Sequence, residues 1–112
     1  IYDIRAALRH LYRILKPGGV LLVTSPGIQR VSRHEGTDPW GSYWRFTTQS
    51  ARRLFHEEFP AANVEVKAYG NVLAAVAFLQ GLATEELRKE ELDHFDREYD
   101  VSVTVRAVKP KT

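Results

Sequence analysis

The stretch Leu15-Lys16-Pro17-Gly18-Gly19-Val20-Leu21-Leu22-Val23 decides the fold. The apolar residues before it recur at helical spacing: Ile4, Leu8, Leu11 and Leu15. Proline disfavours helix at the preceding residue, and a glycine pair supplies the left-handed turn in which helices often end. A run that is apolar on both faces follows at once. Such a run is typical of a strand inside a sheet that is covered on both sides.

One helix followed by one buried strand cannot form such a sheet. We therefore expect the chain to be the tail end of something larger. Its first residue is Ile1, and methionine is absent from all 112 positions. Both features fit a piece of a longer protein, whose other part would hold some of the chemistry.

Composition limits the class of protein. Hydrophobic residues make up 44%, charged residues 27%, and the net charge is +2, which is typical of a globular protein. Without cysteine the chain has no disulfides, no thiolate nucleophile and no cysteine-based zinc site. The absence of cysteine also fits a reducing compartment, so we expect a cytoplasmic location. No apolar run approaches bilayer length.

The remaining pattern predicts two more strands and three more helices. Strands are expected at about 19–24, 63–69 and 100–108, because the second and third runs alternate between apolar and other residues. A helix should begin at Thr47 or Thr48 and bury Ala51, Leu54, Phe55 and Phe59. An apolar helix is expected over 72–82, and a charged helix capped by Thr84 should turn Leu87, Leu92 and Phe95 inward. Residues 109–112 read as a polar tail, and no linker divides the single domain 1–112.

A second motif lies in the long loop of about 27–46. Together, Lys16-Pro17-Gly18-Gly19 and Tyr43-Trp44-Arg45-Phe46-Thr47 resemble class I S-adenosylmethionine-dependent methyltransferases of the methyltransferase-11 type. The resemblance covers nearly the whole chain and corresponds to the C-terminal half of that fold. It implies an α/β, Rossmann-like sheet in which the three strands are the fifth, sixth and seventh. The seventh strand would be antiparallel and lie between the other two.

The resemblance implies S-adenosylmethionine as cofactor, bound mainly by an upstream half. The glycine-rich loop and the acidic residue that hold this cofactor in the family have no counterpart here. Gly18-Gly19 precedes a strand rather than opening a helix, so it reads as a helix stop. We expect no cofactor-binding residue in this chain.

In the family, substrate residues lie on loops that correspond to 25–45. His34 is the candidate general base, since its unperturbed pKa is near neutral, with Glu35 and Asp38 nearby; solvated loop residues are the alternative. Arg45 could bind a substrate carboxylate or phosphate, or could pin the loop. Tyr43 and Trp44 could line a substrate pocket or anchor the loop.

Other polar residues suggest less. His10, His56 and His94 lack ligand partners at metal-binding spacing, so no metal site is expected. Ser25 in Thr24-Ser25-Pro26-Gly27 reads as a turn residue, because proline rules out a nucleophile elbow.

Three functions fit these observations. The first is a methyltransferase acting on a small molecule, active only as part of a longer chain and contributing the substrate-side loop. The second is a non-catalytic α/β module that dimerises through the exposed edge of the first strand. The third is a phosphate or nucleic-acid binder that uses Arg30, Arg33 and Arg45. We favour the first, with a small-molecule partner and neither nucleic acid nor membrane.

Overall fold

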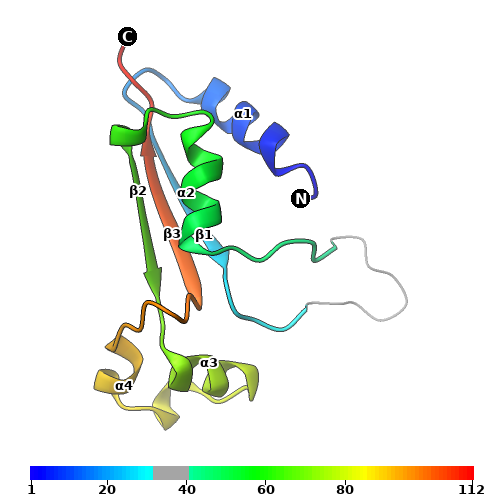
Figure 1. Ribbon diagram of the computed structural model, residues 1–112, viewed down its shortest axis with the longest axis vertical. Coiled ribbons are helices and arrows are strands. Elements are labelled where there is room, and N and C mark those ends of the chain that lie inside the picture. The colour runs from blue at the N-terminus through cyan, green and yellow to red at the C-terminus, as the bar shows by residue number, and fades with distance from the viewer. Residues whose placement is uncertain (32–40) are drawn as a thin grey trace.

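The computed structural model describes residues 1–31 and 41–112. Its sheet has three strands, β1 (Val20–Pro26), β2 (Val64–Tyr69) and β3 (Ser102–Val108), in the order β1-β3-β2. Both neighbouring pairs are antiparallel (Figure 1). The three predicted strands are thus confirmed, and the last strand of the chain lies in the middle as expected.

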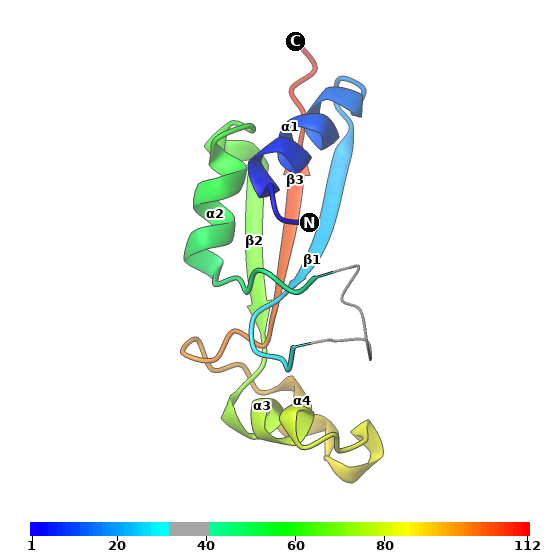
Figure 2. The ribbon, with the colours of Figure 1, turned by 90° about the vertical axis from the view of Figure 1, so that its right-hand side faces the viewer.

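Two helices pack on one face of this sheet. They are α1 (Ile4–Ile14) and α2 (Thr48–His56), and both contribute to the same core (Figure 2). The fully or nearly buried residues of that core are Leu8, Ala51, Phe55, Phe59, Ala68, Val103, Val105 and Ala107. The apolar stripe of the first helix and the predicted inner face of the second are therefore confirmed.

The helix ends follow local chemistry. Asp3 caps α1 by accepting a hydrogen bond from the amide of Ala6, and Thr47 caps α2 by accepting one from Ser50. Gly18 has a φ of 78°, the left-handed conformation expected for the helix stop. The short 3-10 turn η1 (Ala61–Asn63) then leads directly into β2.

Burial of β1 on both faces was expected and is wrong for this chain. Val20 is 44% exposed and Leu22 is 73% exposed, because α1 and α2 cover the opposite face. The same open face of the two other strands carries Glu65, Lys67 and Arg106, which are suited to water. The open face is therefore apolar over β1 and polar over β2 and β3.

The region between β2 and β3 also differs from expectation. The apolar helix is shorter, α3 (Val72–Leu79), and the charged helix is divided into η2 (Thr84–Glu86) and α4 (Lys89–Asp93). Two glutamates explain the division. Glu86 accepts a hydrogen bond from the amide of Ala83, and Glu91 accepts one from that of Arg88, so each side chain caps its own turn.

The side chain of Phe95, in the same region, was expected to face inward and is exposed. Each helix among the described residues is too short or too polar to cross a membrane. Figure 1 shows α3 and α4 together at the end of the sheet farthest from the C-terminus.

Lys109 is not part of a free polar tail. Its Nζ donates hydrogen bonds to the carbonyls of Tyr12 and Leu15, at 3.0 and 2.9 Å, and lies 4.7 Å from the centre of the Tyr12 ring. The last carbonyls of a helix lack a partner in the next turn. A cationic donor there forms hydrogen bonds with them and interacts favourably with the negative end of the helix dipole. Lys109 therefore fastens α1 to the end of β3.

We expect Lys109→Met to lower the free energy of unfolding by about 1.5–3 kcal/mol, because two hydrogen bonds from a charged donor are lost. Chemical denaturation measures this directly. Lys111→Met is the matched control, since Lys111 is exposed and should change stability by less than about 0.5 kcal/mol. Equal effects of the two variants would contradict the capping role.

Candidate functional site

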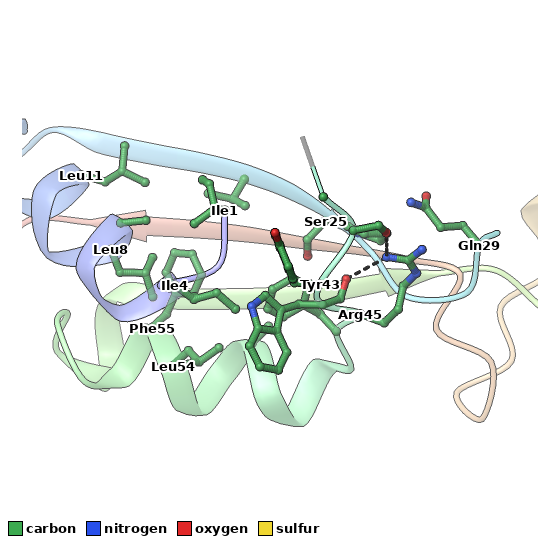
Figure 3. Close-up of a pocket in the computed structure, with 18 residues that line it drawn as sticks. Ile1, Ile4, Leu8, Leu11, Ser25, Gln29, Tyr43, Arg45, Leu54 and Phe55 are labelled. Atoms are coloured by element: carbon green, nitrogen blue, oxygen red, sulfur yellow. Dashed lines mark hydrogen bonds between the residues drawn. The ribbon is translucent and has the colours of Figure 1, made fainter. Parts of the chain in front are cut away.

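A cavity of about 400 Å³ lies between the two helices and the carboxyl end of β1 (Figure 3). Segment 41–46 closes one side of it. The walls from α1 and α2 are apolar, and a few polar side chains gather where β1 ends. All three predicted substrate residues, Tyr43, Trp44 and Arg45, line this cavity.

Aromatic side chains attach segment 41–46 to the start of α1. Trp44 Nε1 donates a hydrogen bond to the carbonyl of Tyr2 at 2.9 Å. The Tyr2 ring lies edge-on to that of Tyr43, with 5.2 Å between centroids, and 5.7 Å from that of Trp44. Tyr43 and Trp44 thus anchor the loop and also form a cavity wall, and their role in substrate binding stays a prediction.

Arg45 is held by oxygens of its own loop. Its Nη1 donates to Ser42 Oγ and to the carbonyl of Trp44, at 3.1 and 2.9 Å, and its Nη2 donates to the carbonyl of Arg30 at 3.0 Å. The planar fork therefore joins the two flanks of the long loop. Of the two roles expected, pinning the loop is the one that these contacts support.

We expect Arg45→Lys to cost about 1–2 kcal/mol of stability, because a single ammonium cannot reproduce the fork. Thermal or chemical unfolding measures the loss. Arg9→Lys, on the exposed side of α1, is the control and should be nearly neutral. An unchanged stability in Arg45→Lys would contradict the role of the guanidinium in pinning the loop.

Ser25 lies in a strand rather than a turn. β1 extends to Pro26, which pairs with Ser102 at the end of the ladder, and proline is tolerated on an edge strand. Ser25 Oγ donates to the carbonyl of Val103 at 3.3 Å and lines the cavity. It is a positioned hydroxyl at the polar end, with no base against it among the described residues.

The remaining predicted residues contribute less. His34, with Glu35 and Asp38, lies outside the described residues. Within 1–31 and 41–112, no three His, Asp or Glu side chains are grouped so as to hold a metal. The absence of a metal site in the whole chain stays a prediction.

The helical walls of the cavity were not predicted as site residues. They include Ile4, Leu8 and Leu11 of α1 and Leu54 and Phe55 of α2, and Ile1 lies just before α1. Sequence patterning assigns such stripes to the core, and only the angle between two helices decides whether a hollow remains. Arg5 and Glu57 brace this angle with two hydrogen bonds of 2.8 and 3.1 Å. The hydrogen bond from Arg5 lowers the pKa of the Glu57 carboxyl from its ordinary value.

Comparison with known proteins finds similarity of structure but no match of sequence. No family model and no curated protein matches the sequence. A solved structure of phosphoethanolamine N-methyltransferase 2 from Haemonchus contortus, in complex with phosphomonomethylethanolamine and S-adenosylhomocysteine, is similar with a TM-score of 0.54. The two sequences are 19% identical, and the match covers 98% of this chain and 30% of that chain. The fold is methyltransferase-like.

This methyltransferase-like fold agrees in part with the resemblance found in the sequence. The chain spans about a third of the length of the methyltransferase it matches. Identity this low supports similarity of fold, and the activity of this chain does not follow from it. The cavity and its loop are therefore described from this chain's own residues.

Proposed function

We propose that the chain is the C-terminal portion of an S-adenosylmethionine-dependent methyltransferase that acts on a small molecule. The strand order carries this proposal. β3 lies antiparallel between β1 and β2, which is the arrangement that the resemblance implies for the seventh strand between the fifth and sixth. Similarity to a solved methyltransferase over 98% of the chain supports it.

In this proposal the cavity is the substrate side of the enzyme. Methyl transfer requires the acceptor to lie in line with the methyl group, and orientation of this kind contributes about 7–11 kcal/mol to lowering a barrier. Tyr43 and Trp44 form a wall, and Arg45 fixes the loop that carries them. His34 is proposed as the base for an acceptor that loses a proton.

The Gly18-Gly19 turn does not fit a cradle for the cofactor. A cradle needs free backbone amides at the start of a helix. The amide of Gly18 donates to the carbonyl of Lys109, and that of Gly19 donates to the carbonyl of Lys16. We therefore assign no cofactor-binding residue here and propose that a longer chain supplies them.

Calorimetric titration of S-adenosylhomocysteine into the protein at its full cellular length tests the proposal. We expect a dissociation constant of about 1–100 μM, typical of a specific small-ligand site. Residues 1–112 alone are the control and should not bind. Absence of binding to the full-length protein at millimolar ligand would contradict the proposal.

A second function is favoured by one observation. Exposed Val20 and Leu22 leave an apolar face on β1, and no charge lies anywhere in Val20–Pro26 to discourage pairing at its edge. A non-catalytic module that forms a two-fold dimer along β1 would cover both the apolar face and the unpaired edge of this strand. Light scattering of the full-length protein distinguishes the two functions. A dimer that Leu22→Lys dissociates, together with no S-adenosylhomocysteine binding, would favour the module.

A further inference from the structure

We propose that the cavity takes an uncharged, largely apolar group of the substrate, such as an aromatic ring system, with its polar end directed toward the end of β1. This inference rests on the proposed function and names the substrate class. It differs from what the similar enzyme holds, because phosphomonomethylethanolamine carries a phosphate.

The distribution of apolar and polar side chains along the cavity gives the expected orientation of the ligand. Figure 3 shows Leu8 and Leu11 of α1 at one end of the cavity and Ser25, Gln29 and Arg45 at the other. The side walls, which are the rest of the apolar lining, include Ile4, Val23, Leu54 and Phe55. A ligand with one apolar end and one polar end fits this gradient, whereas a compact ion does not.

The charges of the described lining residues favour an uncharged group over a phosphorylated one. Among the described lining residues, Arg45 has the one charged side chain, and three oxygens already accept three of its five N–H groups. A phosphate in this space would lose its hydration against a mostly apolar lining and would gain at most the two remaining N–H groups of Arg45, which is an unfavourable exchange. An uncharged ring loses little hydration and gains contact with the side walls.

The volume suits a fused ring. An apolar cavity of about 150 Å³ already binds benzene. The present cavity of about 400 Å³ lies within the usual range for small-molecule sites, so a bicyclic group fits with space for a polar substituent.

The rigidity of the wall supports binding rather than collapse. The bond from Trp44 to Tyr2, the bond from the amide of Phe46 to the carbonyl of Pro26 at 2.8 Å, and the Arg5–Glu57 pair hold three sides of the cavity in place. A site whose walls are already positioned binds without the cost of ordering them.

Methyl NMR of the full-length protein tests the inference, with 1-naphthol and O-phosphoethanolamine as probes. We expect 1-naphthol to shift the methyl signals of Ile4, in the cavity wall, and not those of Ile14, which is exposed at the end of α1. O-phosphoethanolamine should shift neither. Displacement of the Ile4 signals by O-phosphoethanolamine would overturn the inference.

Variants locate the probe. Ala7 lines the cavity and Ala6, beside it on α1, does not. We expect Ala7→Leu to weaken 1-naphthol binding at least tenfold and Ala6→Leu to leave it unchanged. Tyr43→Ala provides a second variant that leaves the core intact, because Tyr43 is 56% exposed and Trp44 still anchors the loop, and it should weaken binding several-fold. Unchanged affinity for 1-naphthol in both Ala7→Leu and Tyr43→Ala would contradict the location of the binding site in this cavity.

The same samples separate this inference from the proposed function. Binding of S-adenosylhomocysteine without binding of 1-naphthol overturns the substrate class alone. Binding of 1-naphthol in the cavity without binding of S-adenosylhomocysteine overturns the methyltransferase alone.

Discussion

Gly27→Ala is expected to destabilise the protein by about 3 kcal/mol or more, a large share of the stability of a small domain. Gly27 follows β1, and its amide donates to the carbonyl of Val101. A Cβ atom at this position would lie 1.8 Å from the carbonyl oxygen of Asp100 and 3.2 Å from that of Phe46. Both obstacles are backbone, so they cannot turn aside as a side chain would. Three segments of the chain meet here only because the residue is glycine.

Gly81→Ala is the control for this prediction. Gly81 has a φ of 76°, so alanine there is strained by about 1–2 kcal/mol, but nothing lies within 4 Å of the added Cβ atom. Chemical denaturation should rank Gly27→Ala as clearly the more damaging variant. A larger loss of stability in Gly81→Ala would contradict the close packing of backbone around Gly27.

Asn71→Ala should cost about 2–4 kcal/mol locally, because one side chain makes three bonds. Asn71 is 4% exposed and caps α3 by accepting a hydrogen bond from the amide of Ala74 at 2.8 Å. Its Nδ2 donates to the carbonyls of Glu91 and His94, both at 2.7 Å. Loss of the cap costs about 1 kcal/mol, and each partly buried carbonyl left without its donor adds to it.

Asn71→Asp separates the two roles. The carboxylate keeps the cap and lies at the favourable end of α3, but it faces two carbonyls without a donor. We expect hydrogen exchange to speed up in α4, and to stay slow in α3, whose cap is kept, and in β3. Asn63→Asp is the matched control, since Asn63 makes one such bond, to the carbonyl of Val108. Normal protection of α4 in Asn71→Asp would contradict the link between the two helices.

The positions of the strands and of α2 were predictable because their signals are local. The order of the strands was predictable from the family resemblance. The Pro17-Gly18-Gly19 break, the Thr47 cap and the alternation in 102–108 act within a few residues, and the structure has each of them. The division of the helix after Thr84 depends on the side chains of Glu86 and Glu91 competing for nearby amides. Composition alone gives no measure of that competition.

The candidate site was predictable only in its loop. Tyr43, Trp44 and Arg45 stand out in sequence because aromatic and arginine side chains cluster there. The apolar walls do not, since a leucine that faces a hollow and a leucine that fills a core have the same spacing along a helix. The anchoring by Lys109 joins residues 94 and 97 positions apart, a contact that no local pattern contains.

Hydrogen–deuterium exchange of the full-length protein, with and without S-adenosylhomocysteine, tests the proposed function most directly. In open α/β sheets, ligands bind outside the carboxyl ends of the parallel strands. The groups that hold this ligand are proposed to lie outside residues 1–112, but the bound ligand would cover the carboxyl end of β1 without hydrogen bonds from it. We therefore expect saturating ligand to slow exchange at Ser25–Ile28 and at 41–46, and to leave the opposite end of the sheet, around Val64, unchanged. No change at any of these amides under millimolar ligand would contradict the proposed methyltransferase function.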